Sequence, residues 1–325
     1  MAGAALSFPP FRARPPWWGR DLQTLRNHIL RVGPGLAEHP AERLAFPLSD
    51  GDVLLGSLHR PAAASDRALV MLIHGMTGSE DSSYIRASAR HLLGLGYPVL
   101  RLNLRGAGAS RTLCRSRYHA GRSEDLREVL RQTERRLAGH GVFLVGYSLG
   151  ANLLLKYLGE AGGTATTLGA VSISAPIDLG AARHAIMRRR NHIYHRHLLA
   201  ALKAETEGLE LAPEQRRILP EVETIFDFDD QILAPLMGFA GAEDYYRRAM
   251  ALPFLPEIRV PTLMIHALDD PWIPGHSYRA FDWAGNPWLL PLLSERGGHV
   301  GFHGRGSAVP WHDRCMALFF ERCAE

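Results

Sequence analysis

The chain has 325 residues, 46% of them hydrophobic, so it is long enough to bury a large core in one α/β domain or in two smaller ones. Its 37 basic and 33 acidic residues give a formal net charge of +4, and the two kinds are interspersed along the sequence. A nucleic-acid partner is therefore not expected, because a nucleic-acid surface gathers its basic residues on one face.

The cysteines and the apolar runs bear on the expected location. Cys114, Cys315 and Cys323 are an odd number without paired or metal-type spacing, which argues against a disulfide framework and a zinc knuckle. No apolar run in the sequence approaches the roughly 18 to 20 residues of a membrane span, and the first thirty residues lack the apolar core of a secretory signal. We therefore expect a soluble, cytoplasmic protein that needs neither a metal nor another cofactor.

The first forty residues mix proline, aromatic and arginine residues without a clean period. We interpret this segment as an arm that packs on the body of the protein. The alternative is that Trp17 and Trp18 touch a lipid surface. Aromatic residues in a proline-rich arm more often cover a core edge, so peripheral membrane contact is the less favoured interpretation.

From residue 44 the sequence predicts strands. Residues 44–48 and 53–58 flank the turn signal Ser49-Asp50-Gly51-Asp52, which indicates an antiparallel hairpin. Continuous apolar runs then alternate with amphipathic segments, as in a parallel sheet covered by helices on both faces. The predicted strands are 68–73, 98–104, 142–145, 170–173, 262–267 and 288–293, and the predicted helices are 83–95, 124–137, 149–160 and 311–322. The predicted fold class is α/β, with a doubly wound, mostly parallel sheet after an N-terminal antiparallel hairpin.

One interval breaks the alternation of strands and helices. About 75 residues separate the run that ends at Pro176 from the strand that begins near Pro261, which is long for a connection in a compact domain. Its content is polar and helical, including residues 181–203 and 242–250. Such an insertion typically covers the carboxyl edge of the sheet, where α/β ligands bind. We predict one domain over residues 1–325, with a helical cap insertion at approximately 177–255.

The pentapeptide Gly146-Tyr147-Ser148-Leu149-Gly150 carries the sharpest chemical signal. It lies directly after an apolar strand and directly before a helix, so the chain must turn sharply at Ser148 between small residues. Such a turn presents the serine hydroxyl at the sheet edge, beside a helix N-terminus that favours developing negative charge. Ser148 is therefore the candidate nucleophile; the alternative is a serine that only caps the helix.

A serine nucleophile needs a histidine base held by an acid, in the chain order serine, acid, histidine. After the strand at 262–267 come Asp269 and Asp270, and we favour Asp270 because it directly precedes Pro271. After the next strand comes His299, flanked by glycines that leave room for a substrate. The other histidines considered as base are His266 and His303. A metal site built from His192, His195 and His197, or from His299 and His303, lacks a recognisable ligand set, so no metal is expected.

Acyl transfer also needs backbone donors for the oxyanion. The residue after the nucleophile supplies one N–H, here that of Leu149, and the loop after the first central strand supplies the second, for which Met76 is the candidate. The segment at 105–110 superficially suggests a nucleotide-binding loop. It fails because the position that should hold a small residue is Arg111.

With these residues in place, the sequence resembles the YheT-like branch of the α/β-hydrolase superfamily over nearly its whole length. The passages that carry the resemblance are Asp21-Leu22-Gln23-Thr24, His74-Gly75, Asn103-Leu104-Arg105-Gly106, Gly146 to Asn152, Phe226-Asp227, Gly241 to Tyr246, Asp269-Asp270-Pro271 and Gly297 to Phe302. The branch often has histidine where Asp21 stands. The resemblance implies esterase or lipase-like activity, with relatives that act on acylglycerols or phospholipids and yeast relatives that transfer medium-chain acyl groups to ethanol.

The residues and the resemblance together predict a serine hydrolase that cleaves short- to medium-chain or lipid-like esters through an acyl-enzyme. An alcohol acyltransferase would use the same groups with an alcohol in place of water. A haloalkane dehalogenase is disfavoured, since its nucleophile is a carboxylate and Ser148 stands at that position. A catalytically silent protein that keeps the scaffold for binding is the alternative from another class.

Overall fold

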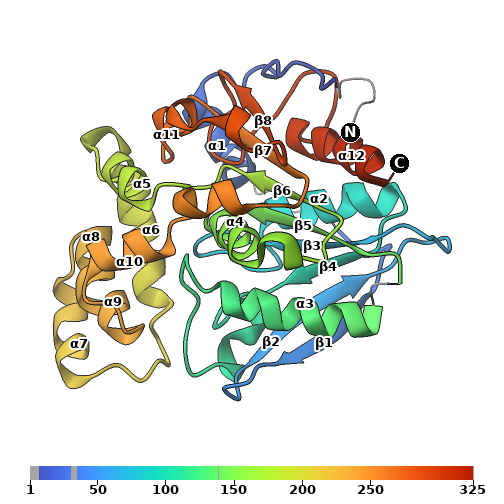
Figure 1. Ribbon diagram of the computed structural model, residues 1–325. Helices are drawn as coiled ribbons and strands as arrows, with labels where there is room; N and C mark the ends of the chain where they lie inside the picture. Colours follow the sequence, from blue (N-terminus) through green and yellow to red (C-terminus); the bar gives the residue numbers. More distant parts are fainter. Residues whose placement is uncertain (1–6, 31–34, 138, 325) are drawn as a thin grey trace.

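The computed structural model describes residues 7–30, 35–137 and 139–324. Its centre is an eight-stranded sheet with the strand order β1-β2-β4-β3-β5-β6-β7-β8 (Figure 1). The strands are β1 (Ala41–Pro47), β2 (Val53–His59), β3 (Leu69–Ile73), β4 (Val99–Leu102), β5 (Val142–Tyr147), β6 (Gly169–Ile173), β7 (Thr262–Ala267) and β8 (Leu289–Ser294). β2 pairs antiparallel with β1 and with β4, and the neighbours from β4 to β8 are parallel. The predicted hairpin and the mostly parallel sheet are confirmed.

Burial explains why the central strands could be recognised as continuous apolar runs. Every residue of β3, β4, β5, β6 and β7 is buried, because both faces of the sheet are covered. In β3, Val70 and Leu72 join the core on one face while Met71 and Ile73 join the core on the other. The outer strand β1 buries only its alternate residues Leu44 and Phe46, as an edge strand with one solvated face does.

Four helices cover the two faces of the sheet. α2 (Ser83–Gly94) and α12 (Trp311–Ala324) pack on one face, and α3 (Ser123–Leu137) and α4 (Leu149–Ala161) pack on the other (Figure 1). All four lie where apolar periodicity predicts them. The sheet is therefore doubly wound, and the carboxyl ends of its parallel strands meet along one edge.

Between β6 and β7 the chain forms a group of short helices that lies to one side of the sheet in Figure 1, coloured from yellow-green to orange. We call residues 179–257 the inserted helices. They comprise α5 (Leu179–Ile186), α6 (His192–Ala204), α7 (Pro213–Ile218), α8 (Ile225–Phe228), α9 (Ala234–Leu236) and α10 (Ala242–Ala249), with short 3₁₀ turns at Arg189–Asn191, Leu219–Glu221 and Leu252–Glu257 and a π-helical turn at Asp229–Leu233. After β7 follow α11 (Gly275–Ala280) and β8.

The N-terminal arm contains a helix that the sequence analysis did not predict. α1 (Arg20–Ile29) follows Gly19, and Gln23 is its buried residue. Leu22, Leu25 and Ile29 recur at helical spacing, so the periodic signal was present, although Leu22 and Ile29 stay exposed and polar contacts hold the helix in place. The arm does pack on the body as interpreted, since Arg14 donates its backbone N–H to the carbonyl of His303 at 2.9 Å.

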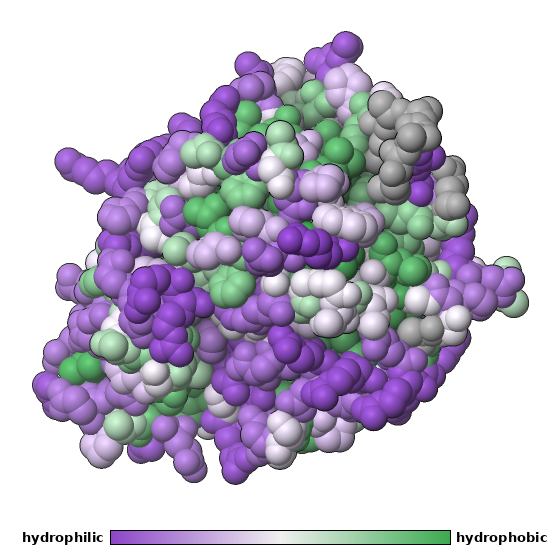
Figure 2. All heavy atoms as spheres, in the orientation of Figure 1, coloured by the Kyte–Doolittle hydropathy of each residue, from purple (hydrophilic) through white to green (hydrophobic). Residues whose placement is uncertain are grey.

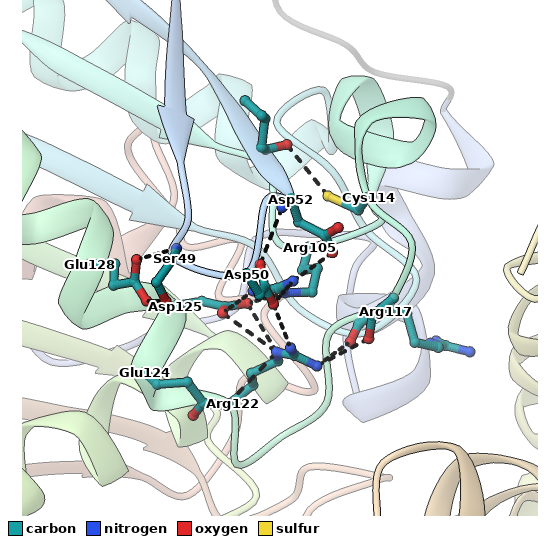
Figure 3. Close-up of polar contacts among 12 residues, drawn as sticks. Ser49, Asp50, Asp52, Arg105, Cys114, Arg117, Arg122, Glu124, Asp125 and Glu128 are labelled. Atoms are coloured by element: carbon teal, nitrogen blue, oxygen red, sulfur yellow. Dashed lines mark hydrogen bonds and ion pairs between the residues drawn. The ribbon is translucent and has the colours of Figure 1, made fainter.

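A buried ion network ties the hairpin turn to the body (Figure 3). Arg105, in the loop after β4, donates to both carboxylate oxygens of Asp125 at 2.8 and 2.7 Å, to Asp52 at 2.5 Å and to Asp50 at 2.7 Å. Burial lowers the pKa of the Arg105 guanidinium, but the hydrogen bonds and charges of Asp125 and Asp50 outweigh burial and raise this pKa well above its usual value. The network fixes the start of the loop at residues 105–122, which leads to the sheet edge; the backbone N–H of Tyr118 also donates to the Arg105 carbonyl.

Replacing Arg105 by leucine should lower the free energy of unfolding by about 3 to 5 kcal/mol, because Asp52 and Asp125 would stay buried without their buried cation and keep only the longer contacts to Arg115 and Arg122. Urea denaturation measures the loss. Arg60→Leu is the matched control, since Arg60 pairs with Glu42 on the surface and should cost less than about 1 kcal/mol. Equal losses for the two variants would contradict a stabilising role for the network.

Candidate active site

Ser148 lies at the turn between β5 and α4 in a conformation that few non-glycine residues adopt, with φ 51° and ψ −121°. On both sides of this turn the backbone lies very close to other backbone atoms. A Cβ added to Gly146 would lie 2.6 Å from the Ala151 Cα, and one added to Gly150 would lie 2.2 Å from the His74 carbonyl oxygen. Both glycines of the pentapeptide are thus required by packing, and the turn holds Ser148 in a strained position at the sheet edge.

His299 lies between Ser148 and Asp270, although the three residues come from distant parts of the chain. The His299 Nε2 is 2.9 Å from the Ser148 Oγ, and its Nδ1 is 2.7 Å from an oxygen of Asp270. A carboxylate only accepts, so Nδ1 carries the proton and Nε2 is left to accept from the serine hydroxyl. Both the His299 and the Asp270 side chains are almost fully buried, at 5% and 0% exposed.

The two aspartates considered for the acid have different contacts. The second oxygen of Asp270 accepts the backbone N–H groups of Trp272 and Ile273 at 2.8 and 3.0 Å, which fixes the carboxylate toward His299. Asp269 instead accepts the backbone N–H of Gly298 at 3.0 Å and holds the loop rather than the imidazole. The geometry therefore brings Asp270, and not Asp269, against the ring.

The arm holds the histidine loop from behind. The Thr24 Oγ accepts the backbone N–H of His299 at 2.9 Å, and the Gln23 Oε1 accepts the backbone N–H of His303 at 2.7 Å. α1 packs so closely that a Cβ added to Gly298 would lie 2.4 Å from the Arg20 carbonyl oxygen. Sequence reasoning gave Gln23 and Thr24 no function. The only signal that could have singled them out is the motif at residues 21–24 that the resemblance noted.

Asp21 connects the same arm to the inserted helices. One carboxylate oxygen accepts from the Tyr194 hydroxyl at 3.0 Å and the other from Arg190 at 2.9 Å. The Tyr194 ring packs edge-on against Trp272, and Trp272 packs against the His299 ring with 4.3 Å between ring centroids. Asp21, which stands where the branch often has histidine, thus joins α1 to α6 beside the imidazole.

The loop after β3 is held in an unusual shape by buried side chains. Thr77 adopts φ 55°, and its backbone N–H donates to the Tyr118 hydroxyl at 2.7 Å. His74 donates from Nδ1 to the Gly75 carbonyl and accepts the Leu104 N–H at Nε2. Burial lowers the pKa of His74 to about 4, so the ring is neutral and can make both bonds. These contacts leave the candidate oxyanion loop with a fixed backbone.

Met76 and Leu149, the two candidate oxyanion donors, come together at this edge. Both line the pocket that contains Ser148. Within the described residues, neither backbone N–H donates to another protein group. Two residues whose backbone N–H groups are unused among the described residues thus line the same pocket as Ser148.

Two pockets meet at Ser148. The first lies between the sheet edge and the inserted helices, and its wall is mainly apolar; among the residues that line it are Leu179, Ile186, Leu198, Leu202, Ile225, Leu233 and Trp272. The second, of about 230 Å³, lies toward the arm and has a more polar wall; among its lining residues are Thr24, Asn27, His28, His197, His299 and His303. The serine hydroxyl thus faces an apolar space on one side and a polar space on the other.

The other histidines considered from the sequence have contacts of their own. His195 accepts the backbone N–H of Ile225 at 3.0 Å, and the His266 ring stacks on the Tyr278 ring with 3.9 Å between the ring centroids. Burial lowers the pKa of His303 to about 3. Across residues 7–30, 35–137 and 139–324, no group of three or more His, Cys, Asp or Glu side chains is placed to hold a metal ion.

The surface and the helices were compared with what contact with a membrane would require. On the face in Figure 2, hydrophilic side chains cover much of the molecule and apolar ones lie in patches between them. None of the helices in the described part of the chain combines the length and the apolar character needed to cross a bilayer.

Comparison with known proteins identifies the family. The family described as alpha/beta hydrolase fold matches residues 68–305. The chain belongs to the α/β-hydrolase family. Within this family the hydrolase is 34% identical to the YheT protein of Escherichia coli (strain K12) over 269 residues, which are 81% of this chain and 78% of that protein. The YheT-like branch expected from the motifs is thereby confirmed.

Two further comparisons extend this result. The hydrolase is 29% identical to a monoacylglycerol lipase of Saccharomyces cerevisiae over 80% of this chain, and it spans about three fifths (61%) of the length of that protein. An esterase of Pyrococcus furiosus has the same fold, with a TM-score of 0.61 and 17% identity over 90% of this chain and 95% of that one. The structural likeness concerns the fold alone.

Gly298→Ala tests whether the close approach of the arm constrains the histidine loop. At Gly298, φ is 62° and the added Cβ meets the arm, so we expect a loss of about 2 to 4 kcal/mol in the free energy of unfolding. The control is Gly208→Ala, where φ is 82° but nothing lies within 4 Å, so only the backbone cost of about 1 kcal/mol should appear. Urea denaturation measures both losses. Equal losses would show that α1 can move away from the added Cβ without lowering the free energy of unfolding.

Proposed function

We propose that the protein hydrolyses carboxylic esters, with Ser148 as nucleophile, His299 as base and Asp270 as the acid that orients it. The observation that carries the proposal is the line of contacts from Asp270 through His299 to Ser148, at 2.7 and 2.9 Å, at the mouth of an apolar pocket. The yeast relative named as a monoacylglycerol lipase supports the same reaction class. We also propose that residues 1–325 form one domain, with the insertion at about 177–255 as a cap.

The reaction follows from the contacts. The Ser148 Oγ attacks the ester carbonyl carbon while His299 Nε2 takes its proton, and the Asp270 carboxylate stabilises the imidazolium that forms. The negative charge on the carbonyl oxygen is stabilised by the N–H groups of Met76 and Leu149. The imidazolium then protonates the leaving alkoxide, which leaves an acyl group on Ser148. Water, deprotonated by His299, releases the acid in the same way.

The two pockets assign the two halves of the substrate. His299 must deliver its proton to the leaving oxygen, and His299 lines the polar pocket toward the arm. The alcohol half therefore lies in that pocket. The acyl chain then extends into the apolar pocket under the inserted helices, where burying each methylene contributes about 0.8 kcal/mol. Such a division suits an acyl ester with an apolar chain and a small or polar alcohol.

Substitutions within the proposed triad should remove the activity without unfolding the protein. Ser148→Ala and His299→Ala should each lower kcat for a p-nitrophenyl ester by about 10⁴-fold or more, since triad members act as a unit. A steady-state assay measures kcat, and the urea midpoint serves to show that each variant is folded.

The neighbouring aspartates give a matched pair for the acid. Asp270→Asn should lower kcat by about 10⁴-fold, because an amide can donate to His299 and stabilise the wrong tautomer. Asp269→Asn keeps an oxygen that can accept the Gly298 N–H, so its kcat should stay within about tenfold of wild type. If the losses were reversed, the acid would be Asp269.

A further inference from the structure

One wall of the apolar pocket beside Ser148 is polar. Arg117 reaches it from the loop after β4, and Arg183, Asp229 and Tyr246 reach it from the inserted helices. Charged groups on the wall of an otherwise apolar pocket are costly unless they are paired or bind a ligand. Their hydrogen bonds therefore indicate whether the protein itself satisfies every polar group on this wall.

Arg117 is buried, and part of its hydrogen-bonding capacity is unused. Its side chain is 4% exposed and points away from the Arg105 network (Figure 3). The guanidinium lies between the rings of Tyr118 and Phe228, and its Nη2 donates to Glu205. Its Nε and Nη1 have no hydrogen-bond partner among the described residues.

Arg183 shows the same pattern on α5. Its Nη2 donates to Glu243 at 2.7 Å, its guanidinium packs on the Phe226 ring, and its buried Nε has no partner in the described part of the chain. A buried donor without a partner costs about 1 to 3 kcal/mol, and natural proteins pair more than 90% of such groups. Both arginines line the pocket, and a small shift of either guanidinium would bring an unused donor to a ligand oxygen there.

Asp229 supplies an acceptor on the same wall. It is 8% exposed, and one of its oxygens accepts from the Tyr246 hydroxyl at 2.7 Å. Burial raises the pKa of Asp229 to about 7, so near neutral pH this carboxyl exists both as an acceptor and as a donor. Tyr246 belongs to the passage from Gly241 to Tyr246 that carries the family resemblance, and here it orients Asp229.

The charges on this wall select the kind of ligand group. Arg117 is paired with Glu205 and Arg183 with Glu243, so each guanidinium charge already has a counter-charge. A ligand carboxylate would add a negative charge beside Asp229, which disfavours it. A neutral hydroxyl can accept from an arginine N–H and donate to Asp229 at once. Of the common oxygen groups on an acyl chain, the hydroxyl fits both the donors and the acceptor.

We propose that the pocket binds an acyl chain that carries a hydroxyl group, with Arg117, Asp229 and Tyr246 as the residues that select it. The proposal rests on the proposed function, since the ester carbonyl at Ser148 fixes one end of the chain. The hydroxyl lies along the chain in the apolar pocket, on the acyl side of the ester. The selective residues act on binding of the substrate and take no part in bond breaking.

Methyl esters of octanoic acid and of its 3-, 5-, 6- and 8-hydroxy derivatives test this proposal with the full-length protein. We expect kcat/KM for at least one hydroxy ester to exceed that for plain octanoate by about tenfold, because a site built to bond a hydroxyl rejects the chain that lacks it. Acid release measures the rate. Methyl hydrogen suberate, with a carboxylate at the far end of an eight-carbon chain, is the charged comparison.

Two neighbouring tyrosines provide the matched control. Tyr246→Phe removes the bond to Asp229, and Asp229→Leu removes the acceptor, so each should lower the hydroxy-to-plain ratio of kcat/KM toward one. Tyr245→Phe removes a hydroxyl that accepts the Ala120 backbone N–H instead, and it should keep the wild-type ratio. Urea midpoints establish that each variant is folded.

The outcomes separate this proposal from the proposed function. Hydrolysis that depends on Ser148 but shows no preference for any hydroxy ester would overturn the proposal alone, as would a preference for the carboxylate ester. A hydroxy preference that survives Tyr246→Phe and Asp229→Leu would assign selection to other residues and also overturn it. Hydrolysis that survives Ser148→Ala would instead overturn the proposed function.

Discussion

The contact between the His299 Nε2 and the Ser148 Oγ depends on two loops that are 151 residues apart in the chain. A hydrogen bond forms only within a few tenths of an ångström of its preferred length, so both loops must be held rigidly. On the serine side, Gly146 and Gly150 allow the backbone to close, and tight packing maintains the strained φ of Ser148. On the histidine side, Asp269 and Ser174 at the sheet edge accept the N–H groups of Gly298 and Val300, and a further constraint comes from outside the sheet.

That outside constraint is the arm. Through Gln23 and Thr24, α1 holds the backbone of the histidine loop, and through Asp21 it holds α6 of the inserted helices. One short helix therefore positions the imidazole and ties down the segment that forms the pocket. The strand edge alone would present the triad residues, but it would leave the histidine loop unsupported on its outer side. We infer that the arm is part of the site and not only a cover for the core.

Much of the fold could be predicted because it depends on local patterns. Strands covered on both faces are continuous apolar runs, and the side chains considered for the triad follow β5, β7 and β8 directly, so chain order alone placed Ser148, Asp270 and His299 at one edge. The remainder depends on pairings between distant residues. Glu205 accepts hydrogen bonds from Arg117 and Tyr118, which lie nearly ninety residues away in the sequence, and no period or motif connects them. α1 could have been predicted from the helical spacing of Leu22, Leu25 and Ile29, but its polar contacts to a loop near the other end of the chain could not.

If the Ser148 hydroxyl is an activated nucleophile, a fluorophosphonate probe will react with it. The probe reacts with an activated serine, and mass spectrometry of the digested protein locates the adduct. We expect one phosphonate per chain on the peptide that contains Ser148, with labelling strongly slowed in His299→Ala. Folded wild-type protein that stays unlabelled, or an adduct at another residue that persists in Ser148→Ala, would contradict this expectation.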